Sequence, residues 1–461
     1  MLIDGKGSDG LEPAGPFLQL YSLSRGQSMA DTNEITTLPL VLGTNPKTHV
    51  VINKHIYTGV VPRSIQNVLV LTENDIEMKG CLIYNIFADD VFFIKCPPWE
   101  NSDTFKPHPL REDEILNYRA WVDTRGLSIG KNDAMDVLIT IARKNIVNPP
   151  KDYFESLVWD NVPRLDTWLT YYLGAEFQDK RYLQLIGSKW LIGIVKRVYE
   201  PGCKFDNVLI LEGNQYIGKS KILEELATIE GERYFTDESI DFRSKDSLML
   251  LQGKLIIEMP ELASFRKAET DLIKGFITRR IDEYRPPYGR KNAIRPRMFG
   301  IGGSVNPTAG YLTDPTGNRR YWPVKCGEKI DIAALIDHKE QIWAEAVHRH
   351  KQGEQIWLEP GEHDLAKIEQ SERLIADLMQ EKIKNIADEL IMLNWDGKDF
   401  FLDELVDKLE IPFLNRDGRL YTRVTNVLVA TGYIEYRPRG SDHKQRRKWK
   451  RVEKTAENRD H

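Results

Sequence analysis

The residues with the clearest chemical capability lie in the stretch Val208–Ser220, VLILEGNQYIGKS. Four apolar residues predict a short buried strand, and the residues after the loop predict a helix. Between them Gly213, Gly218, Lys219 and Ser220 complete the pattern G-x-x-x-x-G-K-[ST]. Such a loop turns backbone N–H groups toward phosphate, its lysine reaches the β- and γ-phosphates, and its hydroxyl ligates Mg²⁺. We therefore expect the chain to bind a nucleoside triphosphate. The expected contacts are Gly213, Asn214, Gln215, Tyr216, Ile217, Gly218, Lys219, Ser220 and Lys221.

Two further apolar runs of strand length end in polar residues. Leu255–Ile257 is followed by Glu258 and then by Glu261, and Met298–Ile301 leads to Asn306. Polar residues at the carboxyl ends of strands face the ligand crevice of an open α/β sheet. One carboxylate there can hold Mg²⁺ and another can polarise the attacking water, so we assign Glu258 to the metal and leave open which one is the base. Asn306 is predicted to hydrogen-bond the water or the γ-phosphate. Alone, each stretch is equally typical of an ordinary turn after a core strand.

The stretch Asp314–Trp322 contains two adjacent arginines, Arg319 and Arg320, after an Asp-Pro-x-Gly turn. Guanidinium stabilises charge on a transferring phosphoryl group, so this turn is suited to present an arginine to the γ-phosphate of a neighbouring subunit. From this stretch alone, an arginine pair in a surface salt bridge is an equally good interpretation.

Basic residues also gather in two longer stretches. Arg279–Arg297 interleaves them with tyrosines, which suits the backbone and bases of single-stranded nucleic acid. Asp399–Val452 predicts two short helices and then a strand–loop–strand, which fits a winged-helix module with a basic wing. A solvated loop and a basic tail are the competing interpretations. The predicted DNA contacts are Arg285, Arg290, Lys291, Arg437, Arg439, Lys444, Arg446, Arg447 and Lys448.

The bulk properties exclude several classes of protein. The chain has 461 residues, 29% of them charged, and a formal net charge of -5, which argues against a wholly basic nucleic-acid coat but allows local basic patches. The four cysteines form no C-x-x-C pair and have no partnered histidine, so we expect neither a zinc site nor a disulfide framework. No apolar run approaches the ~18–20 residues of a membrane span and the start lacks a signal-peptide core, so we expect a cytoplasmic protein without membrane contact.

Composition and periodicity divide this α/β chain into six predicted segments. Glycine, proline and polar residues dominate the start, and helical spacing begins near Arg111 and returns after Trp322. The segments are a flexible tail (1–60), a small accessory α/β region (61–110), a helical domain (111–200), a P-loop ATPase core (201–330), a helical segment (331–395) and a winged-helix-like basic module (396–461).

Several stretches resemble the virulence-associated protein E family. Its members are P-loop ATPases of the AAA+ class from phages and mobile elements, and they are similar to the superfamily 3 replicative helicases. The matching stretches are VWDNVPRLDTWLTYYLGA (158–175), PGCKFDNVLILEGNQYIGKS (201–220), LIIEMPEL (255–262), EYRPPYGR (283–290) and DPTGNRRYWPV (314–324). The resemblance implies an AAA+-type core in an ATP-driven motor that acts on DNA as a hexameric ring.

Carried over by position, the resemblance assigns Lys219 and Ser220 to the Walker A motif, Glu258 and Glu261 to Walker B, and Asn306 to sensor 1.

The same resemblance assigns Arg319 or Arg320 to the arginine finger that acts in trans. Lys204 stands where such proteins offer a lysine to the neighbouring subunit's nucleotide. The chain departs from the family at Tyr216 and Asn161, where glycine is usual.

We therefore expect an ATP-hydrolysing DNA motor, a hexameric superfamily 3-like helicase for replication of a phage or mobile element in the bacterial cytoplasm. Its expected cofactors are ATP and Mg²⁺. Its expected partners are single-stranded or forked DNA, further copies of the chain, and a separately encoded primase, since residues 1–110 show no paired catalytic carboxylates. The alternative is an ATP-controlled DNA-binding or origin-binding regulator with little unwinding activity. A small-molecule phosphotransferase is disfavoured, because it needs neither the arginine turn nor the basic wing.

Overall fold

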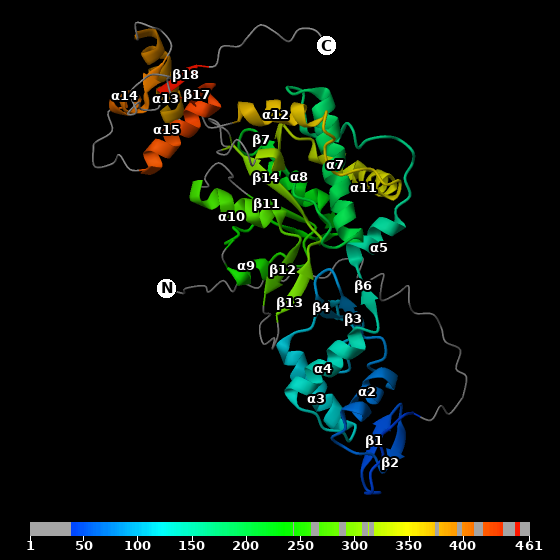
Figure 1. The fold of residues 1–461 in the computed structure, drawn as a ribbon. Helices are drawn as coiled ribbons and strands as arrows, with labels where there is room; N and C mark the ends of the chain where they lie inside the picture. The colour runs from blue at the N-terminus through cyan, green and yellow to red at the C-terminus, as the bar shows by residue number, and fades with distance from the viewer. Residues whose placement is uncertain are drawn as a thin grey trace, which may run out of the picture. The chain divides into compact units, whose positions relative to one another are not determined.

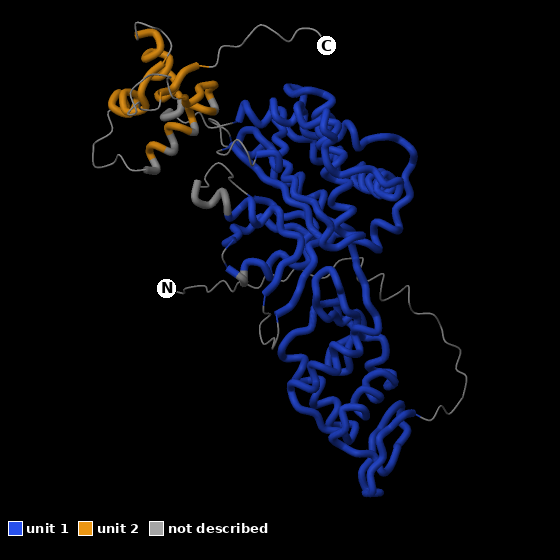
Figure 2. The backbone as a smooth tube through the Cα atoms, in the orientation of Figure 1, with its two compact units in different colours: residues 1–373 blue, residues 374–461 orange. Residues whose placement is uncertain are grey.

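The structure is a computed structural model that describes residues 38–242, 244–259, 267–284, 292–306, 312, 318–373, 378–393, 399–409, 418–436 and 448–451. The chain forms two compact units, residues 1–373 and residues 374–461 (Figure 2). Each unit is described below by itself.

A five-stranded parallel sheet is the centre of the first unit (Figure 1). Its strands are β7 (Val208–Glu212), β10 (Phe235–Thr236), β11 (Ile256–Met259), β14 (Gly300–Val305) and β15 (Tyr321–Lys325). Their order is β10-β11-β14-β7-β15, and every neighbouring pair is parallel. The residues that follow β7, β11 and β14 therefore meet at one edge of the sheet. The predicted α/β class with a parallel sheet is confirmed.

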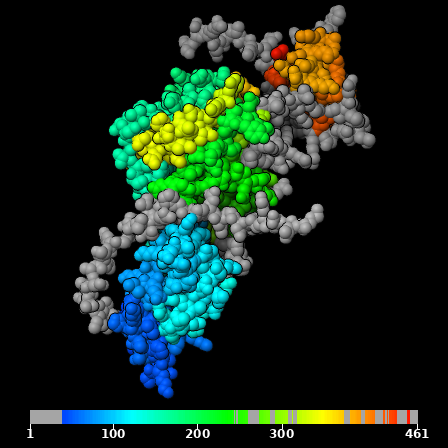
Figure 3. Space-filling model, turned by 180° about the vertical axis from the view of Figure 1, so that it is seen from behind, coloured from blue at the N-terminus to red at the C-terminus, as the bar shows by residue number. Residues whose placement is uncertain are grey.

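Helices and short strand pairs complete this region. The helices are α5 (Pro149–Ser156), α6 (Trp168–Leu173), α7 (Lys180–Tyr199), α8 (Lys219–Leu226), α9 (Lys245–Met249), α10 (Lys267–Thr278), α11 (Ile332–Lys351) and α12 (His363–Glu372). The short elements are the antiparallel pairs β8 (Thr228–Ile229) with β9 (Glu232–Arg233) and β12 (Ile281–Tyr284) with β13 (Ala293–Pro296), and the 3-10 helix η2 (Asn318–Arg320). α11 packs on α7 and α8, and its yellow surface adjoins the green surface of this region in Figure 3.

Two glycines of β14 allow helices to lie close to the sheet. A Cβ on Gly302 would lie 2.8 Å from Leu223 Cδ1 of α8, and a Cβ on Gly300 would overlap Ile194 of α7. Glycine in a strand interior often marks such a close approach. Leu223 and Ile194 are fully buried, so neither side chain has open space into which it can move.

A second hydrophobic core joins the first described residues of the unit. It combines a hairpin with a four-stranded sheet of order β5-β4-β3-β6 and three helices. The strands are β1 (His49–Ile52), β2 (His55–Thr58), β3 (Leu82–Asn85), β4 (Asp90–Phe93), β5 (His108–Pro109) and β6 (Ile146–Val147), and the helices are α2 (Ile65–Asn74), α3 (Glu112–Thr124) and α4 (Lys131–Ala142).

Two predicted boundaries differ from this arrangement. The prediction of a flexible tail over 1–60 is wrong for the β1–β2 hairpin, in which Val50 and Ile52 alternate inward and are buried. The predicted helical domain 111–200 is divided between two cores, since α3 and α4 pack with the N-terminal strands whereas α7 packs with the parallel sheet. The physical reason is the pairing of β6 with β3, which returns the chain to the N-terminal sheet after α4.

The second unit is small and has its own core. Its elements are α13 (Leu378–Leu393), β16 (Phe400–Phe401), α14 (Leu402–Lys408), α15 (Gly418–Ala430), β17 (Tyr433–Tyr436) and β18 (Lys448–Arg451). The strands pair antiparallel in the order β16-β18-β17, and Trp449 of β18 is buried against the helices.

Two further features hold for the described parts of the chain. No helix there is both long enough and apolar enough to cross a membrane. The four cysteines, all of them described, are free thiols.

We predict that Gly300→Ala lowers the free energy of unfolding by about 1–3 kcal/mol, the usual cost of an added methyl group in a packed core. The added Cβ would overlap Ile194. Urea denaturation followed by circular dichroism measures the change. Gly275→Ala is the matched control, because no atom lies within 4 Å of its added Cβ and alanine favours the helix. An unchanged stability in Gly300→Ala would contradict the proposed close packing.

Candidate nucleotide-binding site

The loop between β7 and α8 has the backbone geometry of a phosphate cradle. Gly213 and Gly218 have φ values of 155° and 107°, and α8 begins at Lys219, directly after Gly218. Positive φ is readily accessible to glycine, and the first N–H groups of a helix have no partner within it. The loop thus directs unused donors and the positive end of α8 toward the same point, as anion binding requires.

Lys219 is the first residue of α8, and its side chain contacts the loop. Its Nζ donates to the carbonyls of Gly213 at 2.7 Å and Asn214 at 2.6 Å, and to Asn306 Oδ1 at 2.7 Å. The structure therefore brings together Lys219 and Asn306, which lie 87 residues apart in the chain. The lysine is largely buried, and burial lowers its pKa below the ordinary value.

Ser220 and Glu258 form the second half of the site. Ser220 Oγ donates to Glu258 Oε1 at 2.8 Å, and Glu258 is fully buried at the end of β11. Burial raises the pKa of the Glu258 carboxyl, although the hydroxyl groups of Ser304 and Ser220 beside it oppose that shift. Ser304, on β14, was not among the predicted site residues, although it belongs to the polar end of that strand.

The same pair is suited to hold Mg²⁺. Its donors are a hydroxyl and a carboxylate, the hard oxygen ligands that Mg²⁺ prefers. Glu258 Oε2 is buried and has no hydrogen-bond partner among the described residues, so it has a lone pair available for an ion. Glu261, the other predicted carboxylate, lies outside the described residues.

The two predicted arginines lie at the amino ends of the strands, opposite the phosphate loop. Arg319 and Arg320 directly precede β15, and Lys204 lies shortly before β7, whose first residue pairs with the first residue of β15. They line a cavity of about 320 Å³ together with Trp322, Trp357 and His363. The five residues of β7 separate this cavity from the phosphate loop, a distance of roughly 16 Å.

The side chains that line this cavity differ in their exposure and in their ion-pair partners. Arg319 and Lys204 are exposed, and within the described residues neither has an ion-pair partner. Arg320 is half-buried. Trp322 is buried and its Nε1 has no hydrogen-bond partner in the described chain. Arg319 is therefore the better placed of the two arginines to reach a partner molecule.

Most predicted DNA contacts cannot be located. Arg285, Arg290, Lys291, Arg437, Arg439, Lys444, Arg446 and Arg447 lie outside the described residues. Lys448 lies on β18, where its Nζ pairs with Asp399 Oδ1 at 3.0 Å and lies over the Phe401 ring. It is therefore a partly neutralised cation on the surface of the small unit.

A buried ion network that the sequence did not reveal fixes the end of β7. Arg373 donates to Glu212 through Nε at 2.7 Å and through Nη2 at 3.0 Å, and its Nη1 donates to Glu369 Oε2 at 2.7 Å. Gln178 also donates to Glu369 Oε2, at 2.6 Å. Glu212 immediately precedes Gly213, so α12 and the residue after it hold the entry to the phosphate loop. The partners are 161 residues apart, and no local pattern signals their contact.

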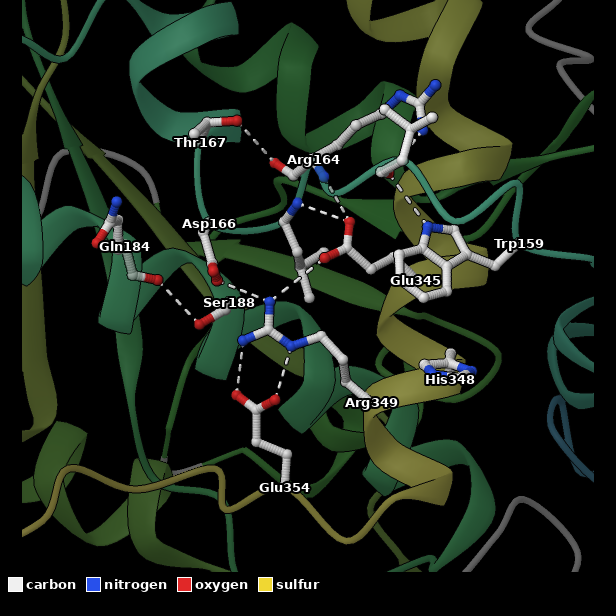
Figure 4. A network of polar contacts seen from close by, with 12 residues as sticks. Trp159, Arg164, Asp166, Thr167, Gln184, Ser188, Glu345, His348, Arg349 and Glu354 are labelled. Carbon is white, nitrogen blue, oxygen red and sulfur yellow. Dashed lines mark hydrogen bonds and ion pairs between the residues drawn. The ribbon is translucent and has the colours of Figure 1, made fainter.

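A second network clamps the segment around Trp159 onto α11 (Figure 4). Glu345 Oε2 accepts the backbone N–H groups of Arg164 at 2.6 Å and Leu165 at 2.9 Å. Arg349 donates to Asp166 at 2.7 Å and binds Glu354 with two nitrogens. These contacts hold the segment from Trp159 to Asp166 on α11, so this segment has a structural role.

Comparison with known proteins now identifies the region that contains this site. The model of the virulence-associated protein E-like domain matches residues 154–375. This part of the chain, somewhat less than half of it, is similar to that domain. That range includes the phosphate loop, Glu258, Asn306 and the arginine cavity. No curated protein matches the sequence.

Solved structures of a protein named NrS-1 are similar to the chain at low identity. One is the A form apo structure of its C-terminal region, with 13% identity and a TM-score of 0.42, and it covers 81% of this chain and 88% of that one. Another apo structure of the region has 12% identity and a TM-score of 0.40, and it covers 77% of this chain and 84% of that one.

The two positions at which the sequence was expected to depart from the resemblance both have left-handed backbone. Tyr216 and Asn161 each have a φ of 65°. Asparagine tolerates this conformation, whereas an aromatic residue is strained in it. Tyr216 is fully exposed at the tip of the phosphate loop, so no packing compensates for that strain.

We predict that Glu258→Gln stabilises the domain without nucleotide, increasingly so as the pH rises. Burial raises the pKa of Glu258 in the folded chain, so folding costs more wherever the carboxyl is ionised. The advantage of glutamine should be absent below the unfolded pKa, about 4.3, and grow as the pH passes through the raised folded value. Denaturant unfolding between pH 4 and pH 8 tests this, with the exposed Glu328→Gln as control. A pH-independent difference would be inconsistent with a buried carboxylate.

Proposed function

We propose that the chain is an ATP-hydrolysing DNA motor of the AAA+ P-loop class, a superfamily 3-like helicase for replication of a phage or mobile element. The observation that carries the proposal is the convergence of Lys219, Ser220, Glu258 and Asn306 around a glycine loop at one edge of a parallel sheet. Their types match the needs of phosphoryl transfer, in which positioning and electrostatic stabilisation supply nearly all of the catalysis. The match to the virulence-associated protein E-like domain supports the same proposal.

Each residue has a separate task at the triphosphate. The loop N–H groups hold the phosphate oxygens, and Lys219 exchanges its two loop carbonyls for the β- and γ-phosphates. Asn306, which already contacts Lys219, orients the attacking water or the γ-phosphate. Ser220 and Glu258 would hold Mg²⁺, which neutralises developing charge on the phosphates when bound.

Arg319 acts on a neighbouring copy. It lies at the opposite end of the strands from the loop of its own chain, so the two faces can meet only between subunits. An interface between unlike faces is heterologous and closes into a ring when the rotation allows. We propose such a ring, a hexamer by the family resemblance, in which Arg319 is the finger and Lys204 lies beside it.

DNA is proposed to contact the basic stretch around residues 285–291 and the small unit. The described residues of that unit form three helices and a three-stranded antiparallel sheet, which supports its assignment as a winged-helix module. The motor would act in the bacterial cytoplasm with a separately encoded primase.

Steady-state ATP hydrolysis, measured with and without single-stranded DNA, tests the motor. We expect DNA to raise the rate, and Lys219→Ala to abolish nucleotide binding because no other described cation lies within the loop. Arg63→Ala, at an exposed arginine of the N-terminal region, serves as a control for the loss of a charge.

We further predict that Arg319→Ala lowers the rate by about 10³-fold or more, as loss of an arginine finger does, while nucleotide binding is kept. Mixed with wild type in equal amounts, it should inhibit more than dilution alone. Arg320→Ala should have the smaller effect, because its side chain is half-buried.

Slow turnover that ignores DNA, with ATP binding intact, would reject the motor in favour of an ATP-controlled DNA-binding regulator. The exposed, strained Tyr216 in the loop favours that second candidate. A Tyr216→Gly variant that turns over ATP faster would assign the slow rate to this side chain.

A further inference from the structure

A cluster of metal-ligating side chains lies in the N-terminal region, outside the match to the family. Glu100, His108 and Glu114 each offer one ligand atom, and these three atoms lie within 4.8 Å of one another. They come from the turn after β4, from β5 and from the first turn of α3. Nothing in the proposed ATPase uses them.

The spacing of the ligand atoms fits a tetrahedral ion. His108 Nε2 lies 3.4 Å from Glu100 Oε1 and 3.5 Å from Glu114 Oε1. Bonds of about 2.0–2.2 Å at tetrahedral angles put neighbouring ligand atoms about 3.3–3.6 Å apart. Both separations from His108 Nε2 fall within that range.

The imidazole is oriented as a ligand. His108 Nδ1 lies 3.0 Å from the Pro109 carbonyl, which can only accept, so Nδ1 carries a proton and Nε2 is the nitrogen that can bind an ion. Nε2 is buried and has no hydrogen-bond partner in the described chain. The rings of Phe93 and Phe105 lie 5.8 Å and 5.6 Å from the imidazole and restrict its movement.

The glutamate on α3 is held in advance. Glu114 is fully buried, and its Oε2 accepts the backbone N–H of Arg111 at 2.8 Å in a capping box. Its Oε1 is thereby directed toward His108. Because this carboxylate is already ordered, an ion that binds it loses little free energy in ordering the ligand.

Arg111 is the cation that now neutralises the cluster. Its Nη2 contacts Glu100 Oε1 and lies 3.4 Å from Glu114 Oε1, while the side chain is 45% exposed. The guanidinium can therefore move into solvent when another cation takes its place.

We propose that Glu100, His108 and Glu114 bind a divalent transition-metal cation, with Zn²⁺ as the matching ion, in competition with the Arg111 side chain. Imidazole with carboxylates suits zinc and its first-row neighbours, and three protein ligands leave a position for water. The expectation of no zinc site rested on the cysteine spacing and the lack of a histidine partnered with a cysteine, and it did not consider this ligand set.

The test uses the full chain, freed of metal by a chelator, in a Glu258→Gln background that removes the carboxylate of the nucleotide site. Titration with Zn²⁺ by calorimetry should give one ion per chain. Co²⁺ at the same site should give the visible absorption of a tetrahedral complex. A chain that takes up no zinc would overturn the proposal and leave a protonated His108 between two carboxylates as the explanation of the cluster.

Two variants separate this site from adventitious binding. His108→Ala should weaken zinc binding by more than about 10–100-fold, the loss usual for a partner outside the ligand set, whereas His55→Ala, at an exposed histidine of β2, should not. Arg111→Ala should tighten binding by about tenfold, because a competing charge is removed. An unfolded chain cannot bind zinc more tightly than wild type. Arg111→Ala therefore tests the site even if His108→Ala fails to fold. Equal affinity in wild type and Arg111→Ala would reject the competition.

Discussion

The close approach of α8 to β14 is the constraint on which the nucleotide site depends. β14 lies between the strand that enters the phosphate loop and the strand that ends in Glu258, so both halves of the site are built across it. A side chain at Gly302 would push α8 away, and with it Ser220 at its start. The 2.8 Å hydrogen bond between Ser220 and Glu258 depends on the absence of a side chain at Gly302, where α8 lies closest to this strand. The contact that packs α8 on β14 therefore also positions the side chains of the site.

The site concentrates polar groups where water is excluded, and each of them except Glu258 Oε2 has a described hydrogen-bond partner. Lys219 is satisfied by two carbonyls and an amide oxygen, and Glu258 by a hydroxyl. Buried groups of this kind seldom stabilise a fold relative to apolar ones, and their retention indicates a task beyond folding. The loop is thus held ready for a ligand at some expense of stability.

The convergence of residues at the proposed nucleotide site could be predicted from sequence because its parts follow from local rules. A glycine loop after an apolar run predicts strand, cradle and helix, and parallel strands bring their carboxyl ends together, which is why Glu258 and Asn306 could be named before any contact was known. The helical and apolar patterns also identified the α/β class. The β1–β2 hairpin was missed although β-branched residues on both sides of Asn53 and Lys54 are the pattern of a short hairpin.

Contacts between distant residues could not be predicted in this way. Glu212 and Arg373 have no distinguishing neighbours, and only the folded chain brings them together. The same holds for Glu100, His108 and Glu114, whose spacing matches no familiar motif. Likewise, the separation of Arg319 from the loop depends on strand order, which periodicity does not report.

Arg373 is also the last residue of the first unit, and the second unit begins with the next residue. Its guanidinium pairs with the residue before Gly213, and its carbonyl accepts the N–H of Leu312 at 2.9 Å. The end of the first unit is thus anchored one ion pair away from the phosphate loop. The loop proposed to bind nucleotide is therefore fixed at its entry by the last residue of its own unit, and not by the sheet alone.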